Sequence, residues 1–330
     1  MTKPRVDVLA LGGTIATGRA PNGGLVPTLS AAALVDAVAG VSDVADVHAE
    51  QVLQRPGADL QVADIVAVVR RAHASIDAGV HGIVVAQGTD TLEEAAFVAD
   101  LLHQVSAPLV FTGAMRNPTQ SGADGPANLL AAVRVAADQS AAGVGVVVVF
   151  ADQIHAARFV RKSHASSPGA FDSPTAGPIG WVAEDRVRIP LRPTSPPRID
   201  PESVNGDRRN VVLVRVVLGD DGELLSAIRD SPIDGLVVEA FGVGHVPEAI
   251  VDMLNRLAQR LPVVFASRTG SGETFRATYG FAGSERELRS AGLIGAGALD
   301  GSKSRLLLAL ALEAGWSRER ITEAFDAWSS

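Results

Sequence analysis

Short apolar runs alternate along this chain with alanine-rich stretches of helical periodicity. The runs in the first half are Val6–Leu11, Gly82–Ala86, Leu109–Thr112 and Val144–Phe150. The helical stretches between them are Ala31–Val38, Ala63–Ala78, Leu92–Gln104 and Pro126–Asp138. Such alternation predicts an α/β fold in which a doubly wound parallel sheet carries helices on both faces. Because aromatic residues make up only 4% of the chain, valine, alanine and leucine must form most of the core.

A proline-rich stretch, Ile189–Arg198, separates this set of elements from a second one. Proline-rich segments are extended and semi-rigid, so this stretch is typical of a linker. The second set has strand-like runs at Val211–Leu218, Gly235–Ala240 and Val263–Ala266. Its helical stretches are Pro247–Gln259 and Lys303–Ala314. We therefore predict a larger N-terminal domain over residues 1–190, a linker over 191–209 and a smaller C-terminal α/β domain over 210–330.

Charge and cysteine content exclude several kinds of partner and site. The net charge is −8 and the basic residues do not cluster, which argues against a nucleic-acid partner. A chain with no cysteine has no disulfide, no thiolate nucleophile and no thiolate-bound metal. The spacing of His155 and His164 matches no common ligand pattern. We therefore expect neither a metal nor another cofactor.

The chain also carries no signal of a membrane segment. No stretch approaches the ~18 apolar residues that a spanning helix needs. The apolar run after Met1–Arg5 has only about six residues, which is too short for a secretory signal peptide. We therefore expect a cytoplasmic protein without a membrane partner.

Two glycine-threonine turns directly follow buried-looking strands. Gly13-Thr14 comes after the first strand, and Gly88-Thr89-Asp90 comes after Gly82–Ala86. Loops at the carboxyl ends of parallel strands converge on one crevice, so we expect the two threonines to meet there. A hydroxyl on a tight glycine turn is exposed and held in place, as a nucleophile must be. After the second turn, Asp90 and Glu93 form a D-x-x-E pattern that predicts a capping box.

Other interpretations of these turns remain open. A threonine after two glycines is commonly only a turn or cap hydroxyl. A glycine pair after a strand also occurs in dinucleotide-binding folds, but no G-x-G-x-x-G follows and no acidic residue ends the next strand. A G-x-S-x-G nucleophile elbow is missing as well. From these turns alone, each threonine is either a nucleophile or a hydroxyl that only stabilises its turn.

Several further segments follow the two turns in a recognisable order. They are Thr112-Gly113-Ala114-Met115-Arg116, Asp124-Gly125-Pro126-Ala127-Asn128-Leu129, Arg161-Lys162-Ser163, Tyr279-Gly280-Phe281 and Lys303-Ser304-Arg305-Leu306-Leu307. Each motif is short, but their order and spacing together are specific. Over nearly its whole length, the chain resembles the bacterial-type L-asparaginases of the asparaginase/glutaminase family.

The resemblance implies an amidohydrolase that converts L-asparagine to L-aspartate and ammonia without a cofactor. Amide hydrolysis needs a nucleophile, a base, oxyanion donors and anchors for the charges of the substrate. By resemblance, Thr14 is the nucleophile of a threonine acyl-enzyme, and Thr89 is a second hydroxyl polarised by Lys162. Asp90 orients Lys162 and holds the α-amino group of the substrate. Sequence alone leaves open which threonine attacks, and the family's chemistry favours Thr14.

The resemblance also implies the remaining site residues, the fold and the assembly. Backbone N–H groups at Gly57 and Ala58, which stand at the family's carboxylate-binding positions, are expected to bind the substrate carboxylate. Those around Gly13, Thr89 and Ala114 are expected to bind the oxyanion, because glycine turns point their N–H groups into the crevice. Glu273 matches a glutamate that reaches the site of a neighbouring subunit, which implies a homodimer or homotetramer with sites at the interface. The expected fold is a flavodoxin-like N-terminal domain followed by the smaller α/β domain.

The chain departs from the family pattern at three places. A loop tyrosine is replaced by Gly24 or Leu25, while Tyr279 is the chain's one tyrosine. A serine and its following Gln or Glu, which hold the substrate carboxylate, are replaced by glycine and alanine, and Arg55 can supply another anchor. An interface asparagine is replaced by His245. These departures leave two alternatives, which are an enzyme for another amide (glutamine, a D-amino acid or a non-amino-acid amide) and a weakly active ligand-binding homologue.

Overall fold

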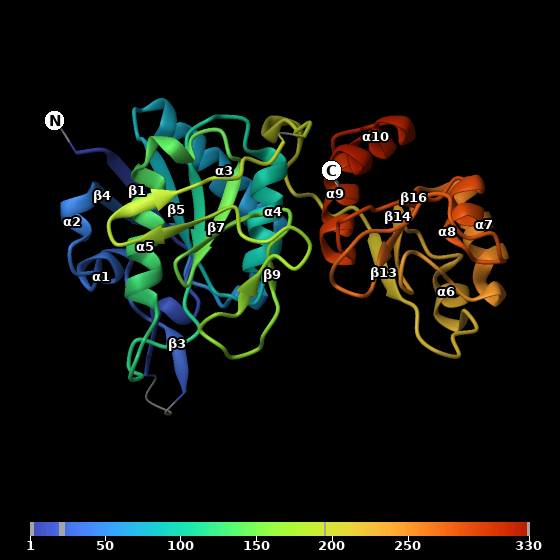
Figure 1. The fold of residues 1–330 in the computed structure, drawn as a ribbon, viewed down its shortest axis with the longest axis horizontal. Coiled ribbons are helices and arrows are strands. Elements are labelled where there is room, and N and C mark those ends of the chain that lie inside the picture. The colour runs from blue at the N-terminus through green and yellow to red at the C-terminus, as the bar shows by residue number, and fades with distance from the viewer. Residues whose placement is uncertain (1–2, 20–23, 195, 329–330) are drawn as a thin grey trace. The chain divides into compact units, whose positions relative to one another are not determined.

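A computed structural model of the chain describes residues 3–19, 24–194 and 196–328. The chain divides into two compact units, one that ends at Pro201 and one that begins at Glu202 (Figure 1). The first unit is a large sheet with helices on both faces, and the second is a smaller α/β unit. The predicted α/β class, with a larger N-terminal and a smaller C-terminal part, is confirmed.

The first unit is built on an eight-stranded sheet with the order β12-β11-β8-β7-β6-β5-β1-β4. Its parallel strands are β1 (Arg5–Ala10), β4 (Asp46–Gln51), β5 (Gly82–Ala86), β6 (Leu109–Thr112) and β7 (Val146–Phe150). The chain runs from β1 to β4 on one side and returns to β5 on the other. The strand order therefore reverses between β1 and β5, and open α/β sheets bind ligands at the carboxyl ends of such strands.

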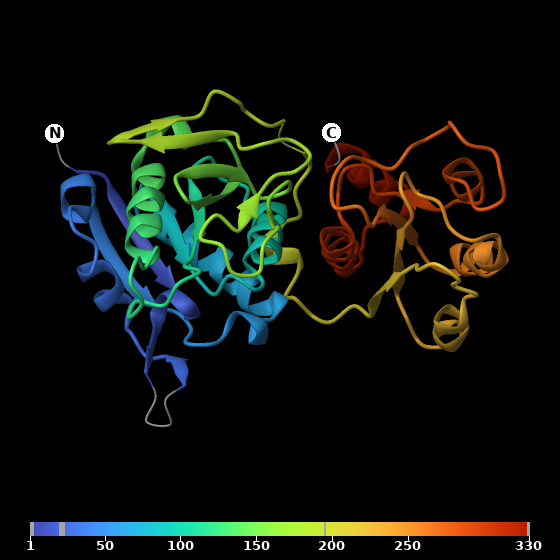
Figure 2. The same cartoon turned by 60° about the horizontal axis from the view of Figure 1, so that its bottom comes forward.

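Helices pack on both faces of this sheet (Figure 2). Small apolar side chains of α1 (Ala31–Asp36), α2 (Val41–Val44) and α5 (Gly125–Ala137) pack against one face. On the opposite face lie α3 (Val62–Asp77) and α4 (Leu92–Leu102). Short elements complete the unit, namely η1 (Thr14–Ala16), β2 (Thr17–Arg19), β3 (Leu25–Pro27), η2 (Gly57–Asp59), η3 (Gln139–Ala141), β9 (Arg161–Lys162), β10 (Phe171–Asp172) and η4 (Pro201–Ser203), which crosses into the second unit.

Three antiparallel strands extend the sheet beyond β7, and the sequence did not predict them. They are β8 (Gln153–Ala156), β11 (Gly180–Ala183) and β12 (Arg186–Arg188). Each is short, and β11 and β12 alternate buried with exposed residues. These three strands lack the long, continuous apolar run that is typical of a strand buried on both faces.

The segment after β12 is bonded to the first unit up to Ile199. The guanidinium of Arg192 donates to the carbonyls of Ser140 and Ala142, and the N–H of Ile199 donates to the carbonyl of Leu101. The second unit then begins with Glu202.

The second unit has a four-stranded parallel sheet in the order β13-β14-β15-β16. The strands are β13 (Val211–Arg215), β14 (Gly235–Ala240), β15 (Val263–Ser267) and β16 (Ile294–Gly295). One face packs against α9 (Gly301–Glu313). The other packs against apolar side chains of α6 (Glu223–Ile228), α7 (Val251–Arg260) and α8 (Glu285–Ser290). The unit also contains η5 (Glu248–Ile250) and α10 (Arg318–Trp328).

Two buried histidines should make the first unit sensitive to acid. Burial lowers the pKa of His103 to about 4 and the pKa of His155 to about 4. Between pH 6.5 and 4 the unfolded chain therefore binds more protons than the folded one. Each neutral histidine therefore makes its full contribution to the free energy of unfolding above pH 6.5. This contribution, about 3 kcal/mol for each histidine, is lost as the pH drops toward 4.

Urea unfolding followed from pH 7.5 to 4.5 measures this loss. We expect His155→Asn to flatten the pH dependence, because asparagine does not take up a proton in this range. The variant should still fold, since asparagine can bond to the hydroxyl of Ser173, which lies 2.9 Å from His155 Nδ1. The matched control is His164→Asn, which replaces an exposed histidine instead of a buried one. An unchanged slope in the His155 variant would contradict the prediction.

Candidate active site

Three glycine turns meet at the carboxyl ends of β1 and β5. Gly13 has φ of 83°, and a Cβ added there would lie 2.2 Å from both the N and the Cα of Gly88. A Cβ on Gly57 would lie 3.1 Å from the carbonyl oxygen of Gly88. Only glycine permits these backbones to approach so closely. The structure thus brings together the turns that carry Thr14 and Thr89, with the turn at residues 57–58 beside them.

A fourth loop, which follows β6, closes on the same place. A Cβ added at Gly113 would lie 2.6 Å from the carbonyl oxygen of Gln87 and 3.3 Å from Cγ2 of Thr89. The next residue, Ala114, is only 1% exposed. The predicted oxyanion donor therefore lies in the loop that packs against Thr89.

The amine of Lys162 joins a hydroxyl and a carboxylate at this edge of the sheet. Lys162 lies in β9, and its Nζ is 3.0 Å from Thr89 Oγ1 and 2.9 Å from Asp90 Oδ1. The lysine side chain is 16% exposed, whereas that of Asp90 is 68% exposed. Thr89 is buried. A charged pair therefore holds the amine against a hydroxyl that solvent hardly reaches.

The predicted capping box at Asp90 and Glu93 is wrong. The cap residue of α4 is Thr91, and no side chain caps that helix end. Asp90 instead binds the amine of Lys162, and Oε2 of Glu93 accepts the backbone N–H of Lys162 at 2.5 Å. Charge-assisted bonds to a lysine segment distant in sequence replace the local cap. Glu93 thus places the lysine, a role that the local pattern concealed.

Backbone N–H groups around the crevice are unpaired. Within the ranges that the structure describes, those of Thr14, Gly57, Ala58, Thr89 and Asp90 donate no hydrogen bond. Of these residues Gly57 and Thr89 are buried, and because buried backbone N–H groups are nearly always paired, their unpaired donors mark a place for a ligand. Donors on glycine turns are suited to bind a carboxylate or an oxyanion.

The structure places the other predicted groups of the first unit less directly. The hydroxyl of Thr14 is half-buried and has no hydrogen-bond partner among the described residues. Arg55 pairs with Asp64, with 3.2 Å between Nη1 and Oδ2, so its side chain is already engaged. The side chain of Leu25, at the place of the missing tyrosine, lies outside the described part of the chain, as do residues 20–23.

Glu273 and His245 belong to the second unit. Glu273 is exposed in the loop between β15 and α8. His245 Nε2 lies 3.2 Å from Oε2 of Glu285, and the ring of His245 contacts Tyr279 and Phe281 edge-on. Sequence reasoning missed Glu285, because nothing in the local sequence pairs a buried carboxylate with a histidine 40 residues earlier.

Glu285 is held as a carboxylate despite its burial. Burial alone would raise the pKa of Glu285, but hydrogen bonds from the backbone N–H groups of Tyr279 and Thr278 bring that pKa below its ordinary value. These bonds are 2.8 and 2.7 Å long. The carboxylate therefore fixes both this aromatic loop and the ring of His245.

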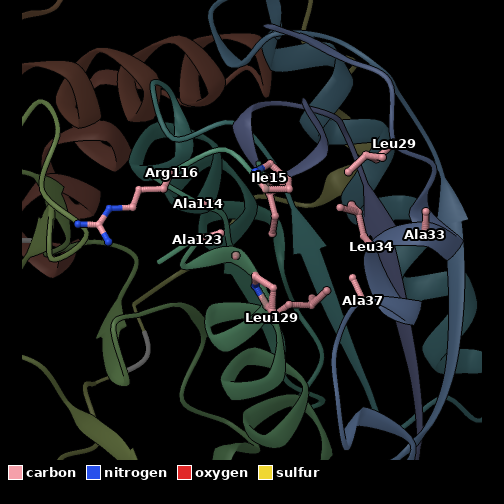
Figure 3. Close-up of a pocket in the computed structure, with 12 residues that line it drawn as sticks. Ile15, Leu29, Ala33, Leu34, Ala37, Ala114, Arg116, Ala123 and Leu129 are labelled. Atoms are coloured by element: carbon pink, nitrogen blue, oxygen red, sulfur yellow. The ribbon is translucent and has the colours of Figure 1, made fainter. Parts of the chain in front are cut away.

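An apolar pocket of about 50 Å³ lies beside the crevice (Figure 3). It is lined by Ile15 and Ala114 and by side chains of α1 and α5, among them Leu34 and Leu129. The guanidinium of Arg116 points away from this pocket and donates to the carbonyl of Gly122 at 3.0 Å. The pocket offers no charged group for catalysis, but it lies directly behind two of the site loops.

The described part of the chain carries neither a metal cluster nor a membrane-spanning helix. Nowhere in residues 3–19, 24–194 and 196–328 do three histidine, aspartate or glutamate side chains gather as a metal ion would require. No helix in those same ranges has the length and apolar character needed to cross a bilayer.

Known proteins match the chain over almost its whole length. The family profile described as Asparaginase, N-terminal, matches residues 5–195, and the Glutaminase/Asparaginase C-terminal domain matches residues 210–325. A probable L-asparaginase of Deinococcus radiodurans is 35% identical over 327 residues, which cover 98% of this chain and 97% of that protein. L-asparaginase 2 of Escherichia coli is 31% identical, with coverage of 98% and 93%.

A solved structure agrees with these matches. The crystal structure of a probable cytoplasmic L-asparaginase from Campylobacter jejuni superposes with a TM-score of 0.88 at 28% identity. The superposition covers 98% of this chain and 100% of the other. The chain therefore belongs to the asparaginase family, whose members are hydrolases that act on amide C–N bonds.

Proposed function

We propose that this protein hydrolyses L-asparagine to L-aspartate and ammonia, with Thr14 as the nucleophile of a covalent acyl-enzyme. The observation that carries the proposal is the contact of Lys162 Nζ with both Thr89 Oγ1 and Asp90 Oδ1, at 3.0 and 2.9 Å. A hydroxyl bonded to an amine provides a route for protons beside the free hydroxyl of Thr14. The names of the relatives supply the substrate.

The reaction proceeds in two steps. Oγ1 of Thr14 attacks the side-chain amide carbon, and its proton passes through Thr89 and Lys162 to the leaving nitrogen. The C–N bond then breaks and ammonia leaves, so that an ester remains on Thr14. Water then attacks the ester carbon, its proton passes along the same route to Oγ1 of Thr14, and the ester C–O bond breaks to release aspartate. The route replaces the loop tyrosine that the chain lacks.

Charges of the substrate find partners around this centre. The exposed carboxylate of Asp90 is suited to the α-amino group of the substrate. Unpaired N–H groups of Gly57 and Ala58 are suited to the α-carboxylate, and those of Thr89 and Ala114 to the oxyanion. The N–H donors have no competing partner among the described residues. Asp90 differs, because its carboxylate also binds the amine of Lys162.

The same proposal includes a homodimer or homotetramer in which Glu273 reaches the site of another subunit. Exposed aromatic side chains near that loop support an interface, since Phe275 is 38%, Tyr279 42% and Phe281 50% exposed. Sedimentation equilibrium measures the assembly. A monomer that is fully active at nanomolar concentration would reject this part.

One observation favours a second candidate, an enzyme for another amide. No side chain is available at Gly57 or on the short Ala58 to select an α-carboxylate, and Arg55 is paired with Asp64. The substrate test therefore compares asparagine, glutamine, D-asparagine and propionamide in an ammonia-release assay. We expect kcat/KM for asparagine to exceed that for propionamide at least about 100-fold, because propionamide lacks the α-amino and α-carboxylate groups that the site would bind.

The outcomes of this assay separate the candidates. Equal turnover of propionamide would reject an asparaginase and support an enzyme for simple amides. Binding of aspartate in calorimetry, without ammonia release from any amide, would identify a ligand-binding homologue.

A further inference from the structure

The loop after β6 is held by a carboxylate from the start of α5. Oδ2 of Asp124 accepts the N–H of Met115 at 2.9 Å, and Oδ1 accepts the N–H of Arg116 at 2.8 Å. Asp124 occupies the cap position of α5, yet its side chain caps no N–H of that helix. The carboxylate is therefore committed to the loop instead of to its own helix.

Asn128, one turn further along α5, holds the other side of the same loop. Its Nδ2 donates to the carbonyl of Gly113 at 3.0 Å, and its Oδ1 accepts the N–H of Ala151 at 3.0 Å. The side chain is 3% exposed, so each of these bonds is shielded from water. Asn128 Nδ2 also lies 3.3 Å from Oδ2 of Asp124, which joins the two side chains. The loop is thus bonded before and after Ala114.

Ala114 itself is the exception in this bonded loop. Within the described ranges, neither its N–H nor its carbonyl forms a hydrogen bond, although the residue is 1% exposed. Figure 3 shows the apolar pocket lined by Ile15 and Leu129 on one side of Ala114. These apolar side chains offer no hydrogen-bond partner to the peptide groups of Ala114. The preceding residue, Gly113, packs against Thr89. The unpaired groups of Ala114 are therefore kept beside the proposed reaction centre.

We infer that Asp124 and Asn128 are positioning residues that hold the peptide groups of Ala114 in place for the reacting amide. Asp124 bonds to Met115 and Arg116, Asn128 bonds to Gly113 and also to Ala151 after β7, and both act on the reaction through Ala114. The inference rests on the proposed amidase function. Because a donor fixed in advance stabilises charge that develops in the transition state, loss of the tether should lower kcat more than it raises KM.

The test replaces Asp124 by asparagine, which keeps the shape but removes one acceptor and the charge. We expect kcat for asparagine to fall about 10- to 100-fold with KM changed less than about threefold. Hydrogen exchange at the N–H groups of Met115 and Arg116 should accelerate at least about tenfold. The matched control is Asp138→Asn at the other end of α5, where Asp138 accepts the N–H of Ser140 at 2.7 Å.

The control removes the same charge and one acceptor oxygen, and we expect no change in kcat or in exchange at residues 115–116. If Asp124→Asn fails to fold, Asn128→Ser tests the other half of the tether, since it removes the bonds of Asn128 to Gly113 and Ala151, and exchange is then measured at the N–H of Ala151. Unchanged exchange in the variant overturns the tether, and faster exchange with kcat within about twofold of wild type overturns the positioning role. If the wild-type protein hydrolyses no amide, the proposed function fails, and exchange still decides whether Asp124 holds the loop.

Discussion

Replacing Thr14 by alanine should reduce ammonia release from asparagine at least about 10⁴-fold, as loss of the attacking atom does in other acyl-enzyme hydrolases. The variant should fold normally, because the hydroxyl of Thr14 has no hydrogen-bond partner among the described residues. Its substrate affinity should be retained, since the N–H groups of the crevice remain. Calorimetry with asparagine then measures binding without turnover.

The second hydroxyl and the amine should matter less. Thr89→Val and Lys162→Met should each lower kcat about 10²- to 10³-fold, because they interrupt the proton route but leave the nucleophile. Thr119→Val is the matched control, since Thr119 bonds only within its own loop, to Asn117. A Thr14→Ala enzyme that keeps more than a hundredth of wild-type turnover, beside an inactive Thr89→Val enzyme, would transfer the nucleophile to Thr89.

Replacing Gly13 by alanine should destabilise the first unit by about 3 kcal/mol or more and abolish activity. The new Cβ would lie 2.2 Å from backbone atoms of Gly88, a distance that real Cβ atoms do not show. Neither backbone can retreat easily, because Gly88 in turn packs against Gly57. Relief therefore moves the turns of Thr14 and Thr89 apart, and the site opens.

Gly79→Ala measures the cost of a positive φ where the new Cβ meets no neighbour. Gly79 has φ of 90°, close to the 83° of Gly13, but a Cβ there meets nothing within 4 Å. We expect it to cost about 1 kcal/mol with activity unchanged, because only the positive φ is penalised. Urea unfolding and ammonia release measure both variants. Equal losses in the two would show that the contact with Gly88 does not hold the site together.

Two strands that are buried throughout were predicted to the residue. The runs Gly82–Ala86 and Leu109–Thr112 form β5 and β6 with the expected bounds, because every residue in them is buried. The strand expected at Val211–Leu218 ends earlier, at Arg215, and Leu218 is 96% exposed. An apolar residue outside the sheet looks the same in sequence as one inside it.

The capping pattern at Asp90 failed for a related reason. A D-x-x-E signal assumes that carboxylates satisfy the nearest backbone N–H groups. Here Lys162 comes 72 residues after Asp90 in sequence and engages the carboxylates of both Asp90 and Glu93. Local patterns hold no information about such a competitor, so the predicted cap was wrong while the neighbouring helix was right.

The amino-acid sequence by itself determined the alternation of the buried strands with helices, the two-part α/β organisation and the family, because hydrophobic periodicity and short motifs are local properties. Tertiary structure alone decided which of the motif residues meet. Glycine turns from three loops pack within van der Waals contact, and β9 delivers an amine to the hydroxyl of Thr89. The physical reason is that burial, close packing and charge pairing depend on distances between segments far apart in the chain, which no local pattern contains.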